Sequence, residues 1–149
     1  MKKPADAQGT ESWGDAAVSG LLAGILAGVV MAGFLAAAGF VGGGTVADVL
    51  SHFSAGDGSS PISGLLTHLA VSGVYGIGWG YLLRIVRRLI VAPAWLVGLA
   101  YGVLLFLLAQ GVFLVGPTLL TGIPPLQFLI AHAIYGLTLG LSTARRGGE

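Results

Sequence analysis

The sequence predicts an all-α membrane protein, a bundle of four transmembrane helices. Of the 149 residues, 55% are hydrophobic and only 9% are charged, whereas soluble domains average about 25% charged residues. Four apolar runs follow one another along the chain, each close to the roughly 20 residues that cross the hydrocarbon core of a bilayer. Small residues recur every four positions in these runs, as they do where membrane helices touch. We therefore expect residues 1–149 to form one membrane domain in contact with the lipid bilayer.

Polar and proline-containing breaks place the individual elements. The predicted spans occupy residues 16–40, 62–83, 93–115 and 126–142. Residues 1–15 form a polar N-terminal segment, with Trp13 at the membrane surface. The loop 42–60 contains a stretch whose apolar spacing predicts a short interfacial helix. Pro61 is suited to open the second span, because proline is tolerated in the first turn of a helix.

The positive charges predict the orientation of the bundle. They are confined to the two termini and the connection after the second span: Lys2, Lys3, Arg84, Arg87, Arg88, Arg145 and Arg146. The other two connections contain no lysine or arginine. The positive-inside rule then places both termini and the middle connection in the cytoplasm. We expect a multi-pass protein of the bacterial inner (cytoplasmic) membrane, and the net charge of +1 gives no indication of nucleic-acid binding.

The small residues predict where the helices touch one another. In the second span Gly64, His68, Ser72, Gly76 and Gly80 are four residues apart and therefore form one stripe on a helix. Similar stripes run along the first and fourth spans. The residues predicted to mediate helix packing are Gly20, Gly24, Gly28, Ser72, Gly76, Gly80, Gly136 and Gly140.

A weak internal repeat accompanies these stripes. Gly20, Leu21 and Gly24 match Gly98, Leu99 and Gly102. In the same way, His68, Ser72 and Gly76 of the second span match His132, Gly136 and Gly140 of the fourth. A duplication would give two parallel helical hairpins related by an axis along the membrane normal. Chance matching is the alternative, because the chain contains 26 glycines.

Polar side chains within the spans are the candidate site. His68 and His132 each lie about six residues from the outer end of their span, roughly 9 Å below the membrane surface. Gln110 lies at nearly the same depth, and Thr67 adjoins His68. These four residues are predicted to form one polar layer near the outer face. An unpaired polar group in hydrocarbon costs several kcal/mol, so each member needs a partner.

Three interpretations of the polar layer remain open. In the first, its members bond to one another and fix the packing of the helices. In the second, His68 and His132 are axial ligands of a haem or a (bacterio)chlorophyll. In the third, the histidines transfer protons at a quinol site. Nearer mid-membrane, we expect the hydroxyl groups of Tyr75, Tyr101 and Tyr135 to bond to backbone carbonyls.

The residue content argues against an enzyme. The predicted spans contain no Asp, Glu, Lys or Arg, the chain contains no cysteine, and no GxSxG, HExxH or phosphate-loop motif occurs. Asp48 and His52 are four residues apart in the first loop, but two ligands are too few for a metal site. We predict no catalytic residue and no bound metal, with no cofactor as the leading expectation.

The fourth span closes with the stretch HAIYGLTLG, which contains His132, Tyr135, Gly136 and Gly140. With the four-span layout and the glycine stripe of the first span, this motif resembles the YagU-like and similar uncharacterised bacterial inner-membrane proteins. Their last helix often carries a histidine followed by Tyr-Gly and a further glycine. The resemblance implies a four-span inner-membrane protein and brings no established activity with it.

The leading functional hypothesis is a non-catalytic accessory or scaffold subunit of a larger membrane complex, in respiratory or photosynthetic electron transport. Its partners would be other membrane subunits, which the small-residue faces would contact. A haem- or pigment-binding electron-transfer protein that uses His68 and His132 is the alternative. A protein that handles small solutes or lipids through the outer polar layer is a further alternative.

Overall fold

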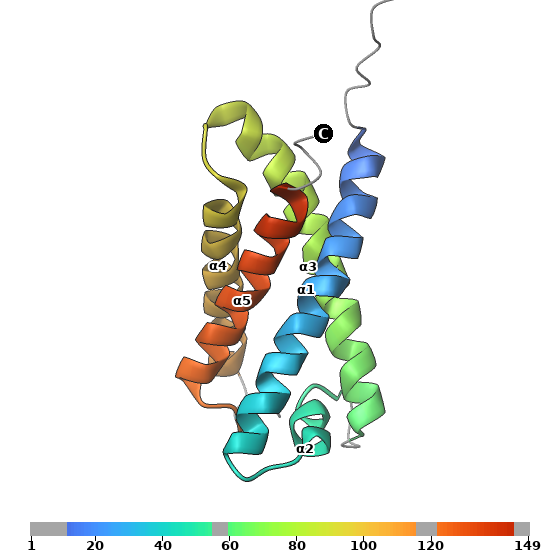
Figure 1. Cartoon of the computed structure of the whole chain (residues 1–149), viewed down its shortest axis with the longest axis vertical. Helices are drawn as coiled ribbons and strands as arrows, with labels where there is room; N and C mark the ends of the chain where they lie inside the picture. The colour runs from blue at the N-terminus through green and yellow to red at the C-terminus, as the bar shows by residue number, and fades with distance from the viewer. Residues whose placement is uncertain (1–11, 55–59, 116–121, 145–149) are drawn as a thin grey trace, which may run out of the picture.

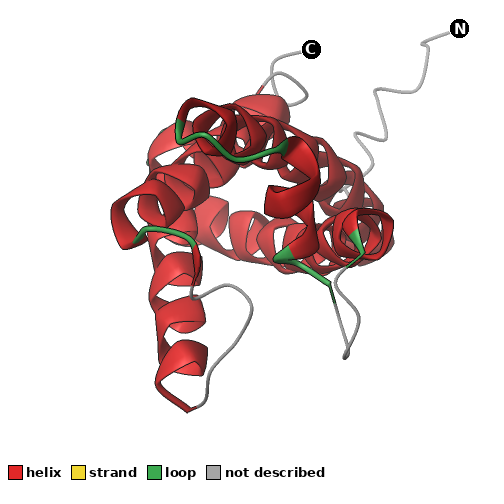
Figure 2. Ribbon diagram, turned by 90° about the horizontal axis from the view of Figure 1, so that it is seen from below, coloured by secondary structure: helices red, strands yellow, loops and turns green. Residues whose placement is uncertain are grey.

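The computed structural model describes residues 12–54, 60–115 and 122–144, and for residues 112–115 the backbone alone. The described residues form helices and loops without a strand (Figure 2). In chain order the helices are α1 (Trp13–Val41), α2 (Val46–Ser51), α3 (Pro61–Leu89), α4 (Ala94–Val115) and α5 (Pro125–Ala144). All of them except α2 are long and apolar enough to cross a membrane. The predicted all-α bundle of four transmembrane helices is confirmed.

Local polar residues determine where the helices begin. At the start of α1 the Ser12 hydroxyl oxygen accepts a hydrogen bond from the Asp15 backbone N–H at 3.0 Å, and the Asp15 carboxylate accepts one from the Ser12 N–H at 2.9 Å. This capping box satisfies two N–H groups that the first turn leaves unpaired. Thr45 and Asp48 form the same arrangement at the start of α2. Pro61 opens α3 in its first turn, as predicted.

α3 is longer than the sequence pattern predicted. Its helix continues past residue 83, through all three arginines of the following connection, and ends at Leu89. Arginine is a good helix former, so the helix continues through these residues. It ends where Ile90 is extended, three residues before Pro93, because proline disfavours a helical conformation in the residue that precedes it. The 29 residues of α3 span about 43 Å, more than the roughly 30 Å of a hydrocarbon core. α3 is therefore long enough for its arginine-bearing end to extend beyond the hydrocarbon core.

The four long helices are arranged as two hairpins (Figure 1). α1 packs along α3, and α4 packs along α5, with the most extensive contacts between elements. α1 also lies against α5 and so joins the hairpins, whereas α3 and α4 touch only sparsely. The short helix α2 lies at one end of the bundle against α1 and α3 (Figure 1).

Glycines bring the backbones of α1 and α3 into direct contact. A methyl group added to Gly20 would overlap the carbonyl oxygen of Gly76 and lie 3.1 Å from the Cα of Gly80. One added to Gly24 would overlap the carbonyl oxygen of Ser72 and lie 2.7 Å from the Cα of Gly76. The stripes on the two helices therefore face each other, at a separation that only glycine allows.

The second hairpin repeats this contact residue by residue. Gly98 of α4 faces Gly136 and Gly140 of α5, as Gly20 faces Gly76 and Gly80 in the first hairpin. The next turn holds the matching pairs: Gly102 faces His132 and Gly136, as Gly24 faces Ser72 and Gly76. The predicted match of the first and third spans agrees with these contacts.

The predicted match of the second and fourth spans is wrong by one helical turn. The contacts make Ser72, and not His68, the equivalent of His132, and they pair Gly76 with Gly136. This register also aligns Tyr75 with Tyr135, so both helices carry Tyr-Gly followed by a glycine four residues later. A four-residue glycine spacing matches itself in several registers, and only the contacts distinguish them.

The two hairpins are in closer contact on the α1–α5 side of the bundle than on the α3–α4 side. On the α1–α5 side the buried residues include the alanines Ala23 and Ala131, which allow close contact. In the repeat register Ala23 corresponds to Tyr101 of α4, and Leu139 of α5 corresponds to Trp79 of α3. The rings of Trp79 and Tyr101 lie between α3 and α4 with their centroids 5.6 Å apart. These larger side chains account for the sparse contact between α3 and α4.

Candidate functional site

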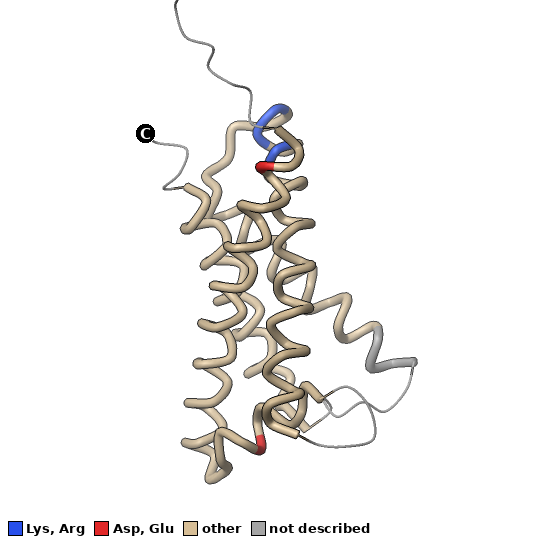
Figure 3. Tube along the Cα trace, turned by 90° about the vertical axis from the view of Figure 1, so that its right-hand side faces the viewer, with Lys and Arg blue, Asp and Glu red and all other residues tan. Residues whose placement is uncertain are grey.

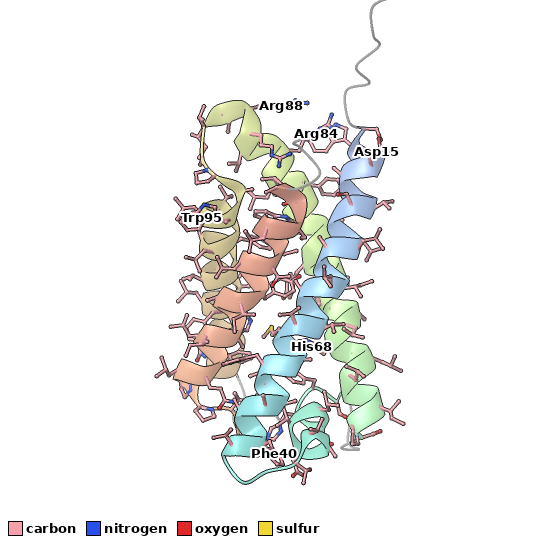
Figure 4. The ribbon with its side chains drawn as sticks, viewed as in Figure 1. Asp15, Phe40, His68, Arg84, Arg88 and Trp95 are labelled. Atoms are coloured by element: carbon pink, nitrogen blue, oxygen red, sulfur yellow. The ribbon has the colours of Figure 1, made fainter. Side chains whose placement is uncertain are left out.

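His68 lies where α1, α2 and α3 meet. Its side chain is buried, and its Nε2 atom lies 3.0 Å from the carbonyl oxygen of Gly28 in α1. Because a carbonyl oxygen can only accept, Nε2–H is the donor. The Phe53 ring, which follows α2, lies 4.7 Å from the imidazole, centroid to centroid. His68 (labelled in Figure 4) therefore connects the two helices of the first hairpin with the segment that follows α2.

His132 is buried in the second hairpin. Its Nδ1 atom lies 2.9 Å from the carbonyl oxygen of Phe128, one turn earlier in α5, and donates to it. The rings of Phe128 and Phe106 approach the imidazole edge-on, with centroids 4.4 Å and 6.1 Å away. The bond at Nδ1 leaves Nε2 of His132 as the nitrogen that can accept a hydrogen bond or bind a metal.

The structure does not join the four residues of the predicted polar layer into a network. Thr67 is half-buried on α3 and Gln110 is half-buried on α4. Among the residues that the structure describes, no hydrogen bond links any two of Thr67, His68, Gln110 and His132. Each histidine instead bonds to a backbone carbonyl of its own hairpin.

The histidine pair does not fit a bis-histidine haem. His68 uses Nε2 on Gly28, so that nitrogen is not available as an axial ligand. The space beside the glycines is also filled: a Cβ on Gly28 would lie 2.6 Å from the Ser72 hydroxyl oxygen, and one on Gly102 would overlap the carbonyl oxygen of His132. The small residues near the histidines therefore accommodate helix backbones, and no macrocycle could lie between the helices at these glycines.

Two tyrosine hydroxyl groups connect the hairpins. Tyr101 of α4 donates to the carbonyl oxygen of Tyr75 in α3 at 2.8 Å. Tyr135 of α5 donates to the carbonyl oxygen of Ser72, also in α3, at 2.6 Å. For these two residues the prediction that tyrosine hydroxyls bond to backbone carbonyls is confirmed. Both bonds end on α3, which has few other contacts with the second hairpin.

Removing the Tyr135 hydroxyl should weaken this connection. We expect Tyr135→Phe to lower the free energy of unfolding by about 1–1.5 kcal/mol, because the bond is buried and polar partners are scarce in a membrane. Tyr101→Phe is the matched control, since its bond is more exposed, and should cost about 0.5 kcal/mol or less. Thermal unfolding in detergent measures the stability of both variants. Equal losses would contradict the assignment of the stronger, buried hydrogen bond to Tyr135.

Trp79 is a core residue that the sequence interpretation did not select. Its side chain is 0% exposed, and its Nε1–H finds no acceptor among the described residues. The sequence signal was a tryptophan between two glycines, well inside a span rather than at the membrane surface where tryptophan is enriched. Its ring fills the interior on the α3–α4 side, where the two hairpins make few contacts with each other.

α2 covers the end of the bundle that holds His68. A methyl group on Gly64 of α3 would overlap the Leu50 carbonyl oxygen, and one on Gly39 of α1 would overlap the Val49 side chain. A methyl group on Gly122, before α5, would lie 2.6 Å from the His52 ring. The loop after α1 thus contains the short helix that its apolar spacing predicted, and this helix packs against α1 and α3.

Asp48 and His52 both bond to groups of their own loop. The Asp48 carboxylate bonds to the Thr45 hydroxyl and backbone N–H, and these bonds lower the pKa of Asp48. His52 bonds through Nδ1 to the Asp48 carbonyl oxygen at 2.7 Å. Within the described ranges no three His, Cys, Asp or Glu side chains are grouped as a metal ion would require.

Comparison with known proteins adds no further constraint. No protein-family model, no curated protein and no solved structure matches the chain. The resemblance of the closing His132, Tyr135, Gly136 and Gly140 motif to YagU-like proteins therefore stays a prediction.

Proposed function

We propose that the protein is a non-catalytic scaffold of the bacterial inner membrane, an accessory subunit that binds other membrane proteins. One observation carries the proposal: the polar rings inside the bundle are used to hold helices. His68, Tyr101 and Tyr135 each donate to a backbone carbonyl of another helix, and His132 donates to its own helix. Side chains committed to such bonds support a structural role rather than proton transfer or catalysis.

The partner surface differs from the one that the sequence suggested. The glycine stripes face each other inside the hairpins, so they are not available to another subunit. The outer faces carry large aliphatic side chains instead, such as Leu22 and Val29 of α1 and Leu107 of α4, all more than half exposed. A partner helix would pack against these residues through dispersion contacts, in competition with lipid.

Purification of the tagged full-length chain in a mild detergent tests the scaffold proposal. We expect a second membrane protein to co-purify in a fixed ratio and to be lost with Gly76→Leu, which disrupts the first hairpin. A stable monomer without a partner would overturn the proposal. A protein that co-purifies with both the wild type and Gly76→Leu would be an unspecific contaminant, and this result would also overturn the scaffold proposal.

A single-histidine haem or pigment protein is the second candidate. The observation in its favour is that His132 donates Nδ1–H to a carbonyl, the arrangement that orients ligating histidines and leaves Nε2 for the metal. An absorption spectrum of the purified protein separates the candidates. The scaffold proposal expects no Soret or chlorophyll band. A band that His132→Ala removes and His68→Ala leaves in place would favour the second candidate.

A further inference from the structure

The corner between α3 and α4 concentrates positive charge at one end of the bundle. Arg84, Arg87 and Arg88 lie within two turns near the end of α3, within about 100° of arc on one side of the helix. Figure 3 shows these charges gathered at one end, while the length of the bundle between the two ends is uncharged. Arg84 and Arg88 are labelled at that end in Figure 4.

Two of these arginines lack an acidic partner within the described part of the chain. Arg87 and Arg88 are exposed, and the described carboxylates are Asp15 and Asp48 alone. The Asp15 carboxylate caps α1, and Asp48 lies at the opposite end of the bundle. The bond recorded for Arg87 joins its guanidinium to the neutral carbonyl oxygen of Thr143, at 3.4 Å. Among the described residues, the two guanidinium groups therefore have no carboxylate as a counter-charge, and they face solvent or headgroups.

Directly after the arginines the chain presents an apolar tip, defined here as Leu89, Ile90 and Val91. Leu89 is 75% exposed and Val91 is 109% exposed. Three consecutive aliphatic side chains held away from the protein are unfavourable in water. They become favourable if the tip enters the acyl boundary of the bilayer while the arginines stay at the phosphates.

Aromatic side chains place this corner at the membrane surface. The guanidinium carbon of Arg84 lies 4.7 Å from the centroid of the Trp13 ring, and Trp13 packs edge-on against Tyr81 at 5.6 Å. Tryptophan and tyrosine concentrate at the level where headgroups meet hydrocarbon. Arg87 and Arg88 follow Arg84 by one turn of helix, so with this aromatic pair at the membrane surface they would be at the level of the lipid phosphates.

We propose that Arg87, Arg88 and the apolar tip form a binding site for an anionic phospholipid. The guanidinium groups bind the headgroup phosphate, and the tip contacts the acyl chains of the same lipid. The pairing of charge and exposed apolar surface commits the site to a lipid rather than to free phosphate. This site does not depend on the scaffold function, because it requires only that the bundle is in a membrane.

The test is thermal unfolding of the full chain in detergent, with added phosphatidylglycerol, phosphatidylcholine or inorganic phosphate. Phosphatidylglycerol should raise the unfolding temperature at concentrations at least tenfold lower than phosphatidylcholine, and phosphate alone should have no effect. Arg87→Gln with Arg88→Gln should weaken the response to phosphatidylglycerol roughly 30-fold. The matched control is Arg145→Gln with Arg146→Gln, which removes the same charge outside the described residues and should stay within threefold of wild type.

A second variant keeps the test decisive if loss of the arginines alters insertion. Leu89→Ser with Val91→Ser retains every charge and should weaken the response to phosphatidylglycerol roughly tenfold. Equal stabilisation by phosphatidylcholine would overturn the proposal. Equal losses in the two double-arginine variants would show a general charge effect, and a full response to inorganic phosphate would show a simple anion site. Either result would also overturn it.

Discussion

Gly76→Ala should destabilise the protein by about 3 kcal/mol or more, at the upper end of the cost of overpacking. The added methyl group would overlap the carbonyl oxygen of Gly20 and lie 2.6 Å from the Cα of Gly24. Both neighbours are helix backbone, which cannot rotate away as a side chain can. α1 and α3 would have to separate along their whole contact. Thermal unfolding in detergent, followed by circular dichroism, measures the loss.

Gly33→Ala is the matched control, because it makes the same chemical change in a transmembrane helix where nothing lies within 4 Å. Its unfolding temperature should stay close to that of the wild type. Gly136→Ala should resemble Gly76→Ala, since Gly136 meets Gly98 and Gly102 in the equivalent contact of the second hairpin. If Gly76→Ala were as stable as Gly33→Ala, the backbone contact between α1 and α3 would be disproved.

His68→Ala should cost about 2–4 kcal/mol, because it removes a buried ring and a buried hydrogen bond together. The ring supports Phe53 beside α2, and its Nε2–H holds the carbonyl of Gly28. We therefore expect α2 to detach from the end of the bundle. Hydrogen exchange of the backbone amides of residues 46–53 should become faster in this variant.

Two further variants separate the parts of this effect. His68→Phe keeps a ring against Phe53 and loses only the bond to Gly28, so it should cost about 1 kcal/mol. His52→Ala removes a histidine that bonds within its own loop helix, and it should cost less than either His68 variant. A wild-type unfolding temperature for His68→Ala would contradict the structural role assigned to this histidine.

Much of the architecture follows from local sequence. The apolar runs identify the four transmembrane helices because a bilayer core of about 30 Å demands about 20 apolar residues. Pro61 marks the start of α3 through its own backbone chemistry. The hydroxyls of Tyr101 and Tyr135 bond to backbone carbonyls, as expected where no water competes. Each of these features depends on one residue type in a known environment.

The candidate site was less accessible to sequence reasoning. His68 and His132 were placed at one depth by counting residues from the span ends, and this suggested a shared layer. The structure gives each histidine a carbonyl partner in its own hairpin. Counting residues estimates depth, but it does not say which way a side chain faces or which helix lies beside it.

Composition and periodicity by themselves determined that this chain crosses a membrane four times and that its helices touch through small residues. The tertiary structure alone decided the register of those contacts, the equivalence of Ser72 with His132, and the burial of Trp79 between the hairpins. The physical reason is that glycines four residues apart look the same from every neighbouring turn. The backbone contacts distinguish the registers, and in the observed one Tyr101 and Trp79 lie on the α3–α4 side, whereas the smaller Ala23 and Leu139 occupy the equivalent positions in α1 and α5.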